Sequence, residues 1–72
     1  MKVWNLKWYA GNTNRFFIAA DSPMSRKKAL EGFDIIAKKD WAVWVDNNIT
    51  GEVIAESEAE KQRQLDMLEG AL

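Results

Sequence analysis

Residues 41–57, WAVWVDNNITGEVIAES, decide the fold of this 72-residue chain. Two apolar runs flank a segment of turn-forming residues, and Gly51 suits the left-handed backbone that a tight turn needs. This pattern predicts a β-hairpin with strands over about 41–46 and 52–56.

The apolar residues of this hairpin suggest a register. Pairing Val45 with Val53 keeps charge off one face, whereas a shift of one residue would bury two glutamates at a cost of several kcal/mol. The uncharged face, which we expect to be the core side, consists of Trp41, Val43, Val45, Val53 and Ala55. Trp44 and Ile54 are then expected on the opposite, outer face.

The N-terminal part of the chain predicts a second hairpin, with strands over about 2–10 and 15–20. Alternation of Trp4, Leu6 and Trp8 with other residues has the period of a half-buried strand. Glycine and asparagines then favour a turn. Continuing the alternation places Tyr9 and Phe17 on the outer face.

Two helices are predicted, over about 23–39 and 58–69. Ser22 and Pro23 suit the start of the first helix, in which Gly32 indicates a close approach to the sheet. Ser57 and Glu60 form a capping-box pattern at the start of the second, in which Ser57 caps and Glu60 reaches back. Gly70 is the expected stop.

The element order is therefore β-β-α-β-β-α. It predicts a single small α+β domain over residues 1–72, with a four-stranded antiparallel sheet, one helix packed on one face and a C-terminal helix.

The composition argues against most catalytic chemistry. The chain has no His and no Cys, so the usual base near neutral pH and the strongest nucleophile are both missing. Ser25 and Lys28 match S-x-x-K, but no companion motif is present. Residues 46–51 match half of a calcium loop, which lacks its final glutamate at Ser57. We therefore expect no enzyme, no cofactor and no metal site.

The absence of cysteine suits a reducing compartment, and no apolar run approaches the roughly 20 residues of a membrane-spanning helix. A cytoplasmic protein without membrane contact is the expectation.

The outer face carries an aromatic patch that is typical of a protein-binding surface. Its expected members are Tyr9, Phe17, Trp44 and Ile54, with a charged rim of Asp46, Glu52 and Glu56. Two alternatives remain open at this point. The C-terminal helix could cover the face with Leu65, Leu68 and Leu72, or a homodimer could bury it.

Charge is divided unevenly, with a balance of +5 over residues 1–39 and −6 over residues 40–72. The acidic part suits a basic partner. The basic residues of the first helix instead suggest nucleic-acid binding as an alternative. These are Arg26, Lys27, Lys28, Lys38 and Lys39.

We therefore predict a non-enzymatic protein-binding module that works as an inhibitor or accessory factor of a larger machine. Phages and mobile elements encode small proteins of this kind.

Overall fold

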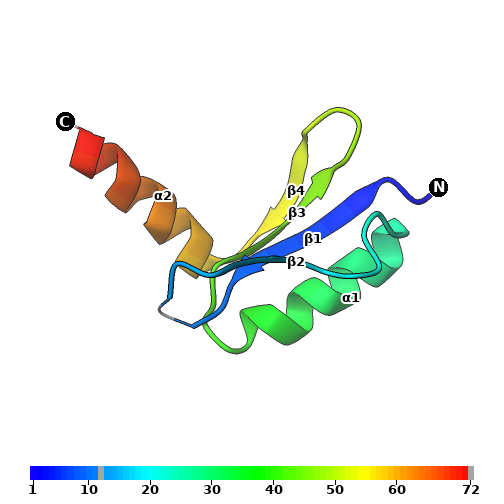
Figure 1. The fold of residues 1–72 in the computed structure, drawn as a ribbon, viewed down its shortest axis with the longest axis horizontal. Helices are drawn as coiled ribbons and strands as arrows, with labels where there is room; N and C mark the ends of the chain where they lie inside the picture. The colour runs from blue at the N-terminus through cyan, green and yellow to red at the C-terminus, as the bar shows by residue number, and fades with distance from the viewer. Residues whose placement is uncertain (12, 72) are drawn as a thin grey trace.

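The chain folds into a four-stranded antiparallel sheet and two helices, which confirms the small α+β architecture (Figure 1). The computed structural model describes residues 1–11 and 13–71. In chain order the elements are β1 (Trp4–Tyr9), β2 (Phe16–Ile18), α1 (Arg26–Ala37), β3 (Val43–Asn47), β4 (Val53–Glu56) and α2 (Glu58–Ala71). The strand order across the sheet is β2-β1-β3-β4. Neither described helix is long and apolar enough to cross a membrane.

The core lies between α1 and the two central strands. Leu6, Val43 and Val45 of the sheet are buried, and Ala29 of α1 is buried against them. Gly32 permits this approach, because a Cβ atom there would lie 2.5 Å from Leu6 Cδ2. The expected close approach of Gly32 to the sheet is therefore confirmed.

The first helix begins three residues later than its sequence suggests. Ser25 is the N-cap, and its Oγ accepts a hydrogen bond from Lys28 N at 3.3 Å. Ser22 Oγ instead accepts from Leu6 N at 3.2 Å. Met24 is bonded in both directions to Trp4, which holds residues 22–24 against β1 and delays the helix.

The second helix is anchored by Ser57, whose side chain is a junction between β3 and α2. Its Oγ accepts hydrogen bonds from Val43 N and Glu60 N and donates one to Trp41 O. The predicted cap is correct, but the reciprocal contact of Glu60 is wrong, because Ser57 N already donates to Val43 O. The predicted stop at Gly70 is also wrong, since α2 continues to Ala71.

The second hairpin forms where expected, but the predicted register is wrong. Val45 lies opposite Ala55, and a β-bulge follows between Val45 and Asp46, so that Asp46 lies opposite Val53. The extra residue turns Ile54 onto the core and Val53 outward, because a bulge interrupts strict alternation. Gly51 has the expected positive φ of 80°.

Trp41 lies outside the strand, contrary to the prediction, since β3 begins at Val43. Asp40 has a positive φ of 61° that turns the chain out of α1. Lys39 Nζ lies 4.9 Å from the centroid of the Trp41 ring, a cation–π contact at this corner.

Candidate protein-binding surface

The first hairpin places different aromatic residues on the outer face than predicted. Tyr9 lies opposite Phe16, and Trp8 lies opposite Phe17. Because directly opposed side chains share a face, Phe17 stacks on Trp8 on the α1 side, with ring centroids 5.7 Å apart. The assignments of Phe17 and Ile54 to the outer face were therefore wrong, whereas those of Tyr9 and Trp44 agree with the structure.

Three aromatic rings from three strands meet on the outer face. Tyr9 of β1, Phe16 of β2 and Trp44 of β3 form what we call the outer aromatic cluster. Their ring centroids are 5.6 to 5.9 Å apart in all three pairs. This spacing is favourable for aromatic pairs, so the rings support one another without a covering layer. Phe16 remains 45% exposed, and Tyr9 and Trp44 are half-buried.

Arg63 of α2 lies over this cluster. Its Cζ atom is 4.6 Å from the centroid of Tyr9 and 5.8 Å from that of Trp44. The guanidinium is held by Glu60, which is only 2% exposed and accepts from Arg63 Nε at 2.6 Å and Nη2 at 2.8 Å. These hydrogen bonds raise the pKa of Arg63 above its ordinary value, against the opposing effect of partial burial. The cluster is thus partly covered by a charged side chain that Glu60 holds in place.

Toward the β3–β4 turn, the outer face carries polar side chains that pair with one another. Asp46 accepts from Lys7 Nζ at 2.8 Å and from Asn5 Nδ2 at 3.2 Å. Asp46 is therefore neutralised by Lys7 and is not the free rim charge that the sequence suggested. Glu56 accepts from Gln64 Nε2 at 3.3 Å, and Glu52 is exposed in the β3–β4 turn.

The second helix leaves most of the outer face open. Beyond its first turns α2 projects away from the sheet (Figure 1). Leu65 and Leu68 are 53% and 65% exposed, so they do not cover the face; Leu72 lies outside the described residues. A depression of about 480 Å³ is lined by Arg63, Gln64, Met67 and Leu68.

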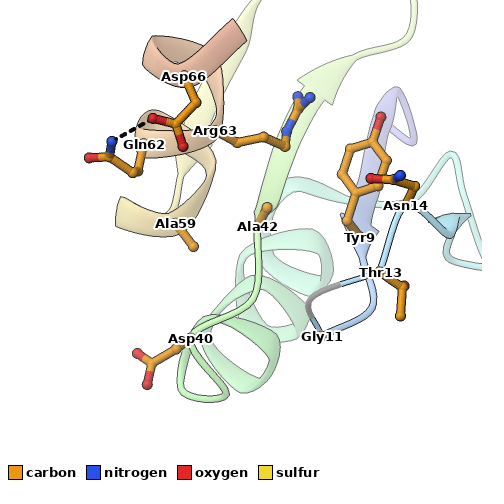
Figure 2. A pocket seen from close by; sticks show the side chains of 10 residues that line it. All are labelled: Tyr9, Gly11, Thr13, Asn14, Asp40, Ala42, Ala59, Gln62, Arg63 and Asp66. Carbon is orange, nitrogen blue, oxygen red and sulfur yellow. Dashed lines mark hydrogen bonds between the residues drawn. The ribbon is translucent and has the colours of Figure 1, made fainter.

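A second, more polar depression of about 410 Å³ lies beside the cluster, where α2 leaves the sheet (Figure 2). Arg63 extends from α2 toward Tyr9, and Gln62 donates to Asp66 at 3.0 Å on the far side. Among the residues that the structure describes, no group of His, Cys, Asp or Glu side chains is arranged to hold a metal ion.

The basic residues proposed for nucleic acid are all exposed, at the two ends of α1. They do not form one continuous basic surface, because Glu31 and Asp34 are also exposed between them. Lys28 Nζ lies 3.0 Å from Asp21 Oδ2. The half-matched calcium loop is a turn in which Asn47 Oδ1 accepts from Ile49 N and Thr50 N.

Comparisons of the chain with protein-family models, with curated proteins and with solved structures gave no match. The interpretation of the outer face therefore rests on its own geometry.

Sequence reasoning missed Phe16 and Arg63. In the strand FFI, alternation shows only that neighbouring side chains point to opposite faces. Because all three residues are apolar, the sequence does not indicate which phenylalanine faces the core. The spacing of Glu60 and Arg63 signals an ion pair on the helix, but not what that pair contacts.

Proposed function

We propose that this chain is a small, non-enzymatic module that binds another protein through the outer aromatic cluster and the adjoining side of α2. The observation that carries this proposal is a group of three aromatic rings on a largely open sheet face, partly covered by an arginine that Glu60 holds in place. Aromatic residues and arginine supply most of the binding energy at protein interfaces. A rigid cluster also lowers the entropy lost on binding.

The charges around the cluster favour a partner segment with apolar and basic side chains. Lys7 and Asp46 neutralise each other, as do Arg63 and Glu60. The remaining charges near the β3–β4 turn and along the outer end of α2 are mainly acidic: Glu52, Glu56, Asp66 and Glu69. An acidic rim around an apolar centre accelerates association with a basic partner and disfavours phosphate-rich nucleic acid.

This function suits an inhibitor or accessory factor acting in the cytoplasm, of the sort that phages and mobile elements encode. The basic residues of α1 support nucleic-acid binding less well, since acidic side chains interrupt them.

The test begins with affinity capture on the immobilised chain, followed by titration of each purified retained protein. For at least one retained protein, we expect Phe16→Ala and Trp44→Ala each to lower the binding affinity at least tenfold, the usual loss for an interface anchor. Ile49→Ala is the matched control, because Ile49 is exposed at the β3–β4 turn, away from the cluster. Equal affinities for all three variants would refute the proposed surface.

A further inference from the structure

Four large apolar side chains are exposed along one margin of the molecule, at the β2 edge of the sheet. Phe16, Phe17 and Ile18 are 45%, 40% and 50% exposed, and Ile35 of α1 is 63% exposed. Ile35 belongs to this margin because it lines a depression of about 280 Å³ together with Ala19, which follows β2. The first helix packs mainly on β1 and β3, so β2 is left without a cover.

The hydrogen-bonding pattern of β2 leaves the backbone N–H and C=O groups of alternate residues pointing to the open edge of the sheet. Ala10 N donates to Arg15 O at 3.1 Å, and Ala19 N donates to Leu6 O at 2.9 Å. Residues of an antiparallel strand alternate between bonding one neighbour and pointing away from it. Phe17 therefore directs its backbone groups toward β1, and Phe16 and Ile18 direct theirs to the open edge.

The opposite edge of the sheet is protected in a way that β2 is not. A β-bulge distorts the β3–β4 pairing, and two glutamates, Glu52 and Glu56, lie at the ends of β4. Bulges and charges are the devices that keep sheet edges from pairing. The three residues of β2 carry neither.

We propose that two copies of this chain associate by pairing β2 with β2, antiparallel, about a two-fold axis at Phe17. In that register Phe16 of each copy faces Ile18 of the other, and both residues point their backbone groups across the new junction. Phe17 then faces Phe17 of the second copy on the α1 side. The result is a continuous eight-stranded sheet.

The charges at the ends of β2 favour the antiparallel arrangement. Arg15 directly precedes the strand, and Asp21 lies three residues beyond its end; both are exposed, and Asp21 also pairs with Lys28 of its own copy. Antiparallel pairing sets Arg15 of each copy opposite Ala19 of the other, with Asp21 as its diagonal neighbour, whereas parallel pairing would set like charges together.

The area available sets the strength of this dimer. A large apolar side chain has a surface of about 150–250 Å². The exposed parts of the four apolar side chains at this margin therefore add up to on the order of 400 Å² per copy. A stable interface buries about 800 Å² per partner, so association should require micromolar or higher concentrations. This dimer does not depend on the proposed function, since it keeps both outer aromatic clusters on the same side of the sheet.

A disulfide test is clean because the chain has no cysteine of its own. In the proposed register the two copies of Phe17 form a non-hydrogen-bonded pair. The Cα atoms of such a pair lie about 4.5 Å apart, within the range that a disulfide spans. With oxidised glutathione as the oxidant, Phe17→Cys should form linked dimers at least tenfold faster than Ile49→Cys, the control on the β3–β4 turn. Equal rates would overturn the proposal.

A charge exchange gives the second test without altering the strand. By sedimentation from about 1 µM to about 1 mM, the parent chain should shift from monomer to dimer. Arg15→Glu should raise the dissociation constant at least fivefold, and adding Asp21→Lys should restore it. If the parent chain stayed monomeric over the whole concentration range, pairing at β2 would be contradicted. It would also be contradicted by a dimer whose dissociation constant does not change in Arg15→Glu but which no longer forms in Trp44→Ala.

Discussion

At the scale of single residues, Gly32 shows how one missing Cβ sets the distance between α1 and the sheet. An added Cβ would lie 2.5 Å from Leu6 Cδ2, and Leu6 is itself buried. Glycine costs about 1 kcal/mol of helix propensity relative to alanine. A glycine here thus gives up helix propensity and allows α1 to pack closely on Leu6.

We predict that Gly32→Ala lowers the free energy of unfolding by about 1–2 kcal/mol, because overpacking outweighs the gain in helix propensity. Gly70→Ala in α2 is the matched control, since a Cβ there meets nothing within 4 Å. It should be neutral or stabilise by up to about 1 kcal/mol. Urea denaturation of both variants checks this, and a stabilised Gly32→Ala variant would disprove the packing argument.

At the scale of elements, the sequence identified all four strands and both helices because each carries a local signal. Ser57 marks the start of α2, and the alternation around Leu6 marks β1. The register of β4 could not be predicted, because a bulge after Val45 leaves no sign in the spacing of apolar residues. The choice between Phe16 and Phe17 depends on pairing with Tyr9, which local alternation does not contain.

The junction at Ser57 makes the position of α2 testable. Ser57→Ala removes three hydrogen bonds and leaves Val43 N and Trp41 O without that partner. We expect a loss of about 2–4 kcal/mol in the free energy of unfolding. Ser25→Ala removes a single exposed capping bond at α1 and should cost about 1 kcal/mol. Similar losses in the two variants would refute the anchoring role of Ser57.

At the scale of the whole molecule, the fold has one covered sheet face and one largely open face. The helix α1 buries the central strands, whereas α2 contributes Arg63 to the outer face and then projects from it (Figure 1). Sequence alone placed Tyr9 and Trp44 on the open face. It could not place Arg63 there, because the direction in which α2 leaves β4 depends on the contacts of Ser57 and Glu60.

The central claim is that the outer aromatic cluster contributes less to folding than the core does and is available to a partner. Its most direct test compares the free energies of unfolding of Phe16→Ala and Phe33→Ala, measured at low micromolar concentration. Phe33 packs against the core, so its truncation should cost about 3 kcal/mol or more. Phe16→Ala should cost only about 1–2 kcal/mol, because Phe16 is 45% exposed and gives up two aromatic contacts. A loss for Phe16→Ala equal to that for Phe33→Ala would mean that the outer face is buried in solution, and the account would be wrong.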